Sequence, residues 1–507
     1  MYKRNCQLSI EDFVFPFGKL NSENKWVKLA EVAPWDKIDD VYAKNFVPNG
    51  APAYPARMAL GSLIVKQMLW CSDVELCEHI AENPYIQYFI GLKEFTEGCP
   101  FGASTLVAFR RRFTEDDLKS INEMIIKNAK GNGKGNGKSN GGNGSTDGNN
   151  SDGDNNKTDG NDSGNNNTEH TLALDATVAP SDITYPQDVK LLNCAREHLE
   201  RIIDDICRGT GLKKPRTYRN CARRDYLNFS KSKKRTIKKT RYAIRRGLAY
   251  IKRDLGYIDA LTNNVDYPAN LDDRTLFLIK TIRTLFEQQT YMYERRTHSV
   301  QNRIVSISQP WVRPIVRGKA KARTEFGAKL HLSVDDKGLA RIETISFDPF
   351  NEADYLIESV KNYHKRKGIY PDRLLVDKIY RNHKNLAFCK EKNIQVSGPR
   401  LGRPPKDHIK TVERKKQERK DAARRNCIEG VFGTAKTTYG LDPVAARLEE
   451  TTKTVIALSI LTFNLKKLLK VSFGHFWDSL FSVLSGLRVD IYDYDCVGGL
   501  YGLRVAE

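Results

Sequence analysis

The sequence lacks the segments that would place the protein in a membrane or send it out of the cell. Its N-terminus, MYKRNCQLSIEDF, has no apolar core of the kind that a signal peptide needs. The most apolar run, residues 455–465, lies between Lys453 and Lys466 and is too short to span a bilayer. We therefore expect no membrane contact, and we interpret this run as a buried helix.

Paired cysteines are also absent. The ten cysteines are scattered along the chain and include no C-x-x-C pair. This argues against a zinc ribbon and against a disulfide framework, and it is compatible with a reducing cytosol. The expected location is the cytoplasm.

Positive charge, by contrast, is in excess. The chain has 83 Lys and Arg against 62 Asp and Glu, with a net charge of +21 and a pI near 9.4. Such an excess predicts a polyanionic partner, either nucleic acid or an anionic membrane surface. Because no membrane segment is present, nucleic acid is the favoured partner.

Most of this excess comes from residues 213–254, which hold 17 Lys or Arg and only two acids. Tyrosine and phenylalanine side chains are interleaved with the cations, which favours a surface that follows phosphates over a merely solvated charged face. The candidate DNA-binding residues in this segment are Lys233, Lys234, Arg235, Lys238, Lys239, Arg241, Arg245 and Arg246.

At 507 residues the chain is long enough for two or three domains. We predict an all-helical, DNA-binding N-terminal domain over residues 1–129 and a flexible Gly- and Asn-rich linker over 130–169. A catalytic domain is expected over 170–470 and a C-terminal tail over 471–507.

Three helical signals support the N-terminal prediction. Residues 55–70 are apolar on all sides, and the segment from Ser72 begins with a capping box and ends before Pro84. A last short helix over 104–113 carries Arg110, Arg111 and Arg112. This pattern is typical of a helix-turn-helix DNA-binding unit. A helical bundle with a solvated basic face remains the alternative.

After the linker, strands alternate with helices. The apolar run TLALDATVAP predicts a buried strand, and a long helical insertion over 188–308 follows it. Residues 326–347 predict a hairpin around the turn DDKG. An amphipathic helix and the apolar runs of RLLVDKIY and NIQVSG come next. The order predicts an α/β fold with a mixed sheet flanked by helices.

Two acids stand where apolar runs of this sheet are expected to end. Asp175 closes the first run, and Asp377 closes the strand after the hairpin. If these strands are neighbours, both carboxylates enter one small volume, where a divalent cation relieves their repulsion. Oxygen ligands without His or Cys favour Mg²⁺ or Mn²⁺. A turn-capping role for each acid remains the alternative.

Glu429 is a candidate third ligand. In a helix it shares one narrow face with Arg425 and Lys436, and this face lies beside an apolar stripe that would dock the helix on the sheet. From helix geometry alone, an ordinary surface pair between Arg425 and Glu429 is an equally good interpretation.

Taken together, these motifs resemble the DDE transposases of bacterial insertion sequences. The order Asp175, Asp377, Glu429 on strand, strand and helix matches the acid triad of that family. The spacing R-x₃-E-x₆-K, here Arg425, Glu429 and Lys436, resembles the signature around the third acid in one large group of these enzymes. The segments LALDATVAPSDITYPQD, LLVDKIYRNHKN and SGPRLGRPPKD are similar to that group as well.

The resemblance implies a catalytic domain with the ribonuclease H-like fold and a basic helical insertion after its first strand. It implies that Asp175, Asp377 and Glu429 hold two Mg²⁺ (or Mn²⁺) ions and catalyse DNA cleavage and strand transfer. Arg425 and Lys436, and less strongly Arg381, are then phosphate-binding residues. A nuclease of the same fold and a non-catalytic DNA-binding relative are the alternatives.

The expected partners are double-stranded DNA, as terminal inverted repeats and as target, and further copies of the chain in a dimer or larger assembly on DNA. The implied location is the bacterial cytoplasm, in association with the nucleoid. Two positions depart from the family pattern. Ala422 replaces the Tyr that precedes the signature Arg, and Ile379 replaces a Gly after the second Asp. Neither change removes a carboxylate.

Overall fold

The fold is taken from a computed structural model of the chain. It describes residues 9–16, 18–47, 52–132, 169–263, 271–316, 324–399 and 408–486, although not the side chains of 130–132, 408–411 and 471–486. Nearly all of the predicted linker, and the predicted tail from residue 487 onward, lie outside the described residues.

Seven helices form the N-terminal part of the chain. The capping box predicted for the fourth is confirmed, because the side chains of Ser72 and Glu75 each accept a hydrogen bond from the other residue's backbone N–H. The helices are α1 (Lys25–Val32), α2 (Trp35–Ala43), α3 (Ala56–Leu69), α4 (Asp73–Glu82), α5 (Pro84–Phe89), α6 (Thr105–Arg112) and α7 (Glu115–Asn132).

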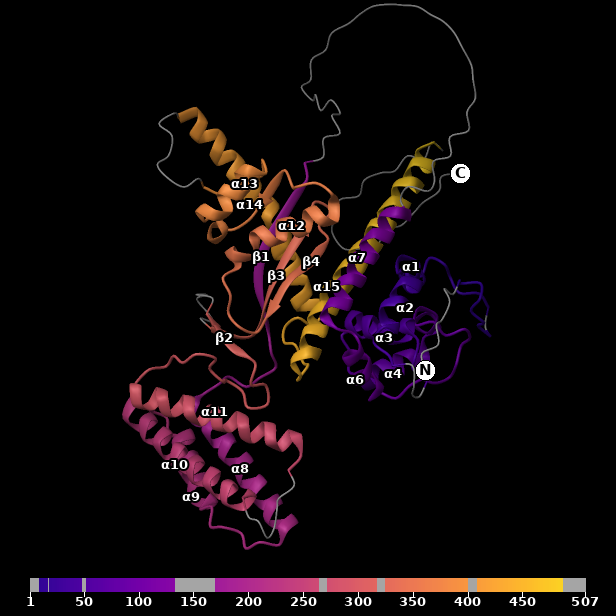
Figure 1. Cartoon of the computed structure of the whole chain (residues 1–507). Helices are drawn as coiled ribbons and strands as arrows, with labels where there is room; N and C mark the ends of the chain where they lie inside the picture. Colours follow the sequence, from indigo (N-terminus) through magenta and orange to yellow (C-terminus); the bar gives the residue numbers. More distant parts are fainter. Residues whose placement is uncertain are drawn as a thin grey trace, which may run out of the picture.

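These helices pack around a helix from the far end of the chain, α15 (Glu449–Gly486). Its side chains Leu458, Leu461 and Leu465 are buried in the same core as those of α1 to α7, and α7 runs beside α15 in Figure 1. The run predicted to be a buried helix is thus confirmed. The predicted boundary at residue 129, however, does not separate two hydrophobic cores, because side chains of α15 lie in the same core as those of α1 to α7.

The centre of the molecule is a mixed six-stranded sheet. Its strands are β1 (Thr171–Pro180), β2 (Arg313–Val316), β3 (Thr324–Asp335), β4 (Ala340–Ser346), β5 (Arg373–Leu375) and β6 (Gln395–Val396). The order is β2-β3-β1-β5-β6, with β4 paired to β3. β1 runs antiparallel to β3 and parallel to β5. The predicted α/β class and the β3–β4 hairpin are confirmed.

Helices cover both faces of the sheet (Figure 1). On one face, Leu172 and Leu174 of β1 pack against α12 (Leu356–Lys367) and α13 (His383–Glu391). On the other face, Ala173 of β1 packs against α14 (His408–Thr438) and α15. Alternation along β1 therefore decides which side chains face α14. Two short 3₁₀ helices, η1 (Glu352–Tyr355) and η2 (Lys378–Tyr380), complete this part.

The helical insertion predicted between the first strand and the hairpin is confirmed. It consists of α8 (Asp188–Thr210), α9 (Arg219–Lys231), α10 (Ile237–Thr262) and α11 (Asp273–Arg295). These helices bury their own apolar cluster, and Figure 1 shows them as a bundle below the sheet. α8 follows β1 and α11 precedes β2 along the chain.

Candidate functional site

The two aspartates predicted to form the site lie on neighbouring parallel strands. The pairing of β1 with β5 places Ala173 opposite Leu375. Asp175 lies two residues beyond Ala173, on the face of β1 that α14 covers, and Asp377 lies two residues beyond Leu375, the last residue of β5. The charges of both carboxylates act on the buried Tyr380. The sequence-based expectation that the two strands are neighbours is therefore confirmed.

The expected position of Asp175 at the end of its strand is wrong. β1 continues to Pro180, and Asp175 lies at its middle, opposite Leu332 of β3. The physical reason is that β3 pairs with β1 from Leu172 to Pro180, so the residues after Asp175 stay in the sheet. Asp175 is accordingly held in the rigid central strand, with its side chain only 20% exposed.

Glu429 approaches this position from α14. The apolar stripe predicted for this helix is buried on the sheet and includes Ile428, Val431 and Ala435. The side chain of Glu429 lies beside that stripe and is 54% exposed. The docking mode expected from helix periodicity is therefore present in the structure.

Arg425 connects two of the acids. One guanidinium nitrogen lies 3.5 Å from Oδ2 of Asp175, and another donates to Oε1 of Glu429 at 3.2 Å. The predicted surface pair of Arg425 and Glu429 thus exists, but the same guanidinium also reaches a carboxylate of the sheet. The cation partly neutralises two anions that would otherwise repel each other. Lys436, further along α14, is half-buried.

Asp377 is exposed at the start of η2, where its side chain accepts a hydrogen bond from the backbone N–H of Lys378 at 2.6 Å. It therefore caps this short helix, which is the turn-capping role that the sequence analysis gave as the alternative. Capping uses one carboxylate oxygen and does not exclude a second ligand on the other.

Tyr380 is a residue of this region to which the sequence assigned no role. It is fully buried directly behind the acids, and its hydroxyl has no hydrogen-bond partner among the described residues. Burial raises its pKa well above the ordinary value, and the charges of Glu352, Asp175 and Asp377 raise it further, whereas Arg425 lowers it. The Tyr380 hydroxyl therefore stays protonated, and the residue adds no charge to the acidic site. In the sequence, Tyr380 is distinguished only by its position at the end of the segment RLLVDKIY, three residues after Asp377.

His331 of β3 stacks on Tyr380, with ring centroids 5.9 Å apart. Both of its ring nitrogens are buried without a partner among the described residues. Burial lowers the pKa of His331 to about 4, although the charge of Glu343 acts in the opposite direction. The imidazole is therefore neutral in the folded protein at neutral pH.

A pH dependence of stability follows from His331. Because its pKa is lower in the folded than in the unfolded chain, the unfolded chain takes up the proton first as the pH falls below about 6.5. We expect the free energy of unfolding to fall by about 2 kcal/mol from this residue between about pH 6.5 and pH 5. Urea unfolding of the native chain and of His331→Leu would measure it. Equal pH dependence in the two proteins would contradict the assignment.

The donor set suits a hard divalent cation in its chemistry, since it consists of carboxylates only. Asp175 and Glu429 already share one cation, the Arg425 guanidinium. In the part of the chain that the structure describes, however, no group of three or more His, Cys, Asp or Glu side chains is arranged to hold a metal ion. The three carboxylates fit such an ion by their chemistry, while Asp175 and Glu429 are arranged around the Arg425 guanidinium.

The predicted phosphate-binding arginines of the N-terminal helices are in different surroundings. Arg110 forms a two-point pair with Asp73, at 3.0 and 2.8 Å, and so supports the packing of α6 on α4. Arg112 covers the ring of Phe46. Arg111 is exposed, and no contact of its side chain is found within the described residues. Only Arg111 therefore presents an uncommitted cation on α6.

Arg381 is buried, with 8% of its surface exposed. Its guanidinium donates to the carbonyl oxygens of Val396 and Ser397, at 3.0 and 2.6 Å. It joins the end of β6 to η2 instead of facing solvent, so the phosphate-binding role predicted for Arg381 does not agree with its position.

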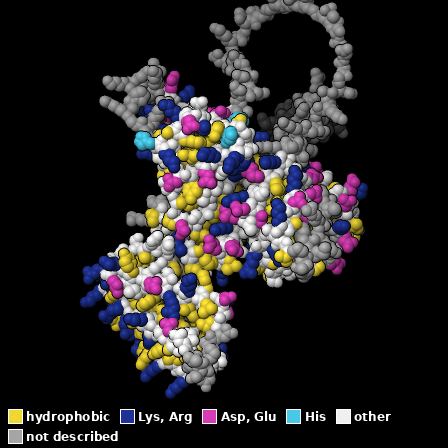
Figure 2. All heavy atoms as spheres, in the orientation of Figure 1, with side chains coloured by type: hydrophobic (Ala, Val, Ile, Leu, Met, Phe, Trp, Pro, Cys, Tyr) yellow, Lys and Arg dark blue, Asp and Glu magenta, His cyan; other side chains and the backbone are white. Residues whose placement is uncertain are grey.

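The predicted cations of the insertion fall into two groups. Lys233, Lys234 and Lys238 are exposed, and Lys239 contacts Ser232 at 3.5 Å. The arginines lie on aromatic rings or on acids; these are Arg235 over Phe229, Arg241 over Tyr293, Arg245 over Tyr242, and Arg246 with Asp225. Figure 2 shows Lys and Arg side chains along the outer edge of this bundle.

Two segments of the chain match known transposase families. Residues 374–466, which include Asp377, Glu429 and the whole of the R-x₃-E-x₆-K motif, match the family described as the transposase DDE domain. Residues 16–112 match a second family, described as a transposase domain. These two matches support a relationship of the chain to the insertion-sequence DDE transposases. This family generally uses divalent metal ions.

One curated relative is an uncharacterized protein, ORF8 of the nfe locus of Rhizobium meliloti. It is 33% identical over 102 residues, which cover 20% of this chain and 49% of the relative. The chain thus spans about half the length of that relative. No solved structure matches the chain. In the described ranges, no helix is both long and apolar enough to cross a membrane.

Proposed function

We propose that this chain is a transposase that binds the terminal inverted repeats of an insertion sequence and catalyses metal-dependent cleavage and strand transfer. The observation that best supports the proposal is the parallel pairing of β1, which bears Asp175, with β5, which ends two residues before Asp377, together with the contact of Arg425 with both Asp175 and Glu429. The family matches supply the reaction class. A sheet of mixed direction with helices on both faces is compatible with the ribonuclease H-like fold.

Asp175, Asp377 and Glu429 would hold two Mg²⁺ or Mn²⁺ ions. Bound there, such ions supply the acidity that activates a water or a DNA 3′-hydroxyl and the charge that stabilises the leaving oxygen. The chain itself fixes the carboxylates. Asp175 is anchored in the central strand, Asp377 at a helix start, and Glu429 on a helix docked by its apolar stripe.

Arg425 would change partners in this reaction. Its guanidinium lies between Asp175 and Glu429, and divalent cations at those carboxylates would repel it. The released guanidinium can bind a phosphate by two parallel hydrogen bonds, in which Arg is the preferred residue. Lys436 lies on the same helix face and would bind a second phosphate oxygen.

DNA would be held by three parts of the chain, namely the site face of α14, the exposed Lys side chains of the insertion, and α6 through Arg111. Because two element ends must be processed together, we expect a dimer or larger assembly on DNA. The protein would act in the bacterial cytoplasm, associated with the nucleoid.

A labelled DNA fragment carrying the repeats that flank the gene, incubated with the chain and Mg²⁺, tests this function. Cleavage followed by joining of the freed 3′ end to target DNA is the expected result. Cleavage without joining would instead favour a nuclease of the same fold. A stable complex without cleavage would favour a non-catalytic DNA-binding relative. Either of these two outcomes contradicts the proposal.

A further inference from the structure

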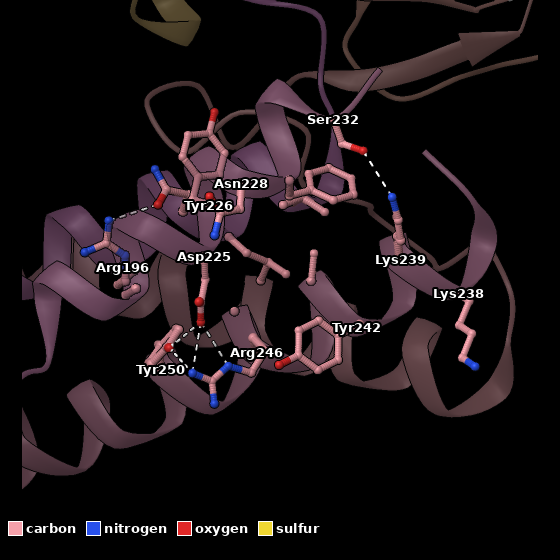
Figure 3. Close-up of a pocket in the computed structure, with 17 residues that line it drawn as sticks. Arg196, Asp225, Tyr226, Asn228, Ser232, Lys238, Lys239, Tyr242, Arg246 and Tyr250 are labelled. Carbon is pink, nitrogen blue, oxygen red and sulfur yellow. Dashed lines mark hydrogen bonds and ion pairs between the residues drawn. The ribbon is translucent and has the colours of Figure 1, made fainter. Parts of the chain in front are cut away.

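The helical insertion contains a cavity that has no role in the proposed transposase reaction. It has a volume of about 600 Å³ and lies between α8, α9 and α10 (Figure 3). This is within the range of small-molecule sites, roughly 300–1,000 Å³. A DNA duplex cannot enter such a space, so the phosphate-binding role of the surrounding cations does not explain it.

Aromatic and aliphatic side chains form the walls of this cavity. Phe229 and Tyr226 line it from α9, Tyr242 from α10 and Leu192 from α8. Tyr242 is 55% exposed, and its hydroxyl has no hydrogen-bond partner among the residues that the structure describes. Tyr226 and Phe229 are half-buried. Accessible aromatic rings in a basic segment are surfaces on which nucleobases stack, whatever their sequence.

The two ends of the cavity differ in charge. At one end, Asp225 accepts hydrogen bonds from Arg246 and from the hydroxyl of Tyr250. At the other, Lys239 contacts Ser232 and Lys238 extends beside it (Figure 3). A nucleotide has the matching polarity, because its base carries hydrogen-bonding groups while its phosphate is an anion that lysine binds.

One carboxylate oxygen of Asp225, Oδ1, accepts no hydrogen bond from the described residues. Both bonds from Arg246, at 3.0 and 2.9 Å, and the bond from Tyr250, at 2.7 Å, reach Oδ2. No described residue donates to Oδ1. Burial acts to raise the pKa of Asp225, but the hydrogen bonds from Tyr250 and Arg246 outweigh it, and the pKa lies below its ordinary value. Asp225 is therefore ionised, and Oδ1 can accept a hydrogen bond from the amino group of a base.

We propose that this cavity binds a single unpaired nucleobase of the DNA, stacked between the aromatic side chains of α9 and α10, with Lys238 and Lys239 on its phosphate. The inference rests on the proposed function only in taking DNA as the partner. An unpaired base would position the insertion on DNA that is distorted or single-stranded, and it would not need the acidic site.

Binding to two DNA duplexes, measured by fluorescence anisotropy without divalent ions, tests the inference. One duplex carries a single unpaired adenosine, and the other carries an abasic sugar at the same place, so the two differ only in the base. The native chain is expected to bind the first roughly tenfold more tightly, the order expected for stacking of one base on an aromatic ring.

Three variants make the result specific. Tyr242→Ala should lose most of this preference while its affinity for the abasic duplex is unchanged. Tyr242→Phe should keep the preference because the ring remains. Tyr291→Ala, which removes a comparably exposed ring from α11 outside the cavity, should behave as the native chain. Equal affinity of the native chain for both duplexes, or an equal loss on both with Tyr242→Ala, would overturn the inference. Binding of neither duplex would contradict the proposed function itself.

Discussion

Glu429→Gln is expected to lower the rate of DNA cleavage about a thousandfold, a loss of about 4 kcal/mol of transition-state stabilisation. The amide keeps the size and shape of the side chain but removes the charge that a divalent ion requires. Cleavage of labelled DNA under single-turnover conditions would measure the loss. Because Glu429 is half-exposed and lies outside the buried stripe of α14, the fold should be unaffected.

Glu413→Gln is the matched control, since it makes the same chemical change at an exposed position of the same helix. This variant should cleave at the native rate, and both variants should bind DNA with native affinity. Native cleavage by Glu429→Gln would remove Glu429 from the site. Lost DNA binding in that variant would mean that the effect is structural.

The second large effect concerns the insertion. Replacing Lys233, Lys234, Lys238 and Lys239 together with Gln should weaken DNA binding by orders of magnitude at low salt. Each phosphate contact contributes about 0.9 to the slope of log affinity against log salt, so the slope should fall by roughly 3 to 4. Affinity measured at several salt concentrations gives both values.

The control carries the same change of charge elsewhere. Lys361, Lys365, Lys384 and Lys390 are exposed on α12 and α13, on the sheet face opposite to α14. Their replacement with Gln should leave the slope within about 1 of the native value. If both sets reduced the slope equally, binding would depend on net charge alone and not on a surface of the insertion.

The local parts of the fold were predictable from the sequence. The capping box at Ser72, the hairpin between β3 and β4, and the buried stripe of α14 each depend on residues close together in the chain. The neighbouring positions of β1 and β5 also followed, since both strands are apolar runs that a shared sheet buries.

Features set by distant parts of the chain were not predictable in this way. The extension of β1 past Asp175 depends on pairing with β3, and the core around α7 depends on α15. The contact of Arg425 with Asp175 joins a helix to a strand far away in sequence. Periodicity reports which face of an element is apolar, but not which distant element covers it.

The most direct test of the central proposal, that these carboxylates bind the catalytic metal, is the metal dependence of cleavage by Asp377→Cys. A thiolate is a poor ligand for Mg²⁺ and a better one for Mn²⁺. Asp377 is exposed at the start of η2, so the substitution should not disturb the core. We predict no cleavage of labelled DNA in Mg²⁺ and recovered cleavage in Mn²⁺. Cleavage at the native rate in Mg²⁺ would contradict the account.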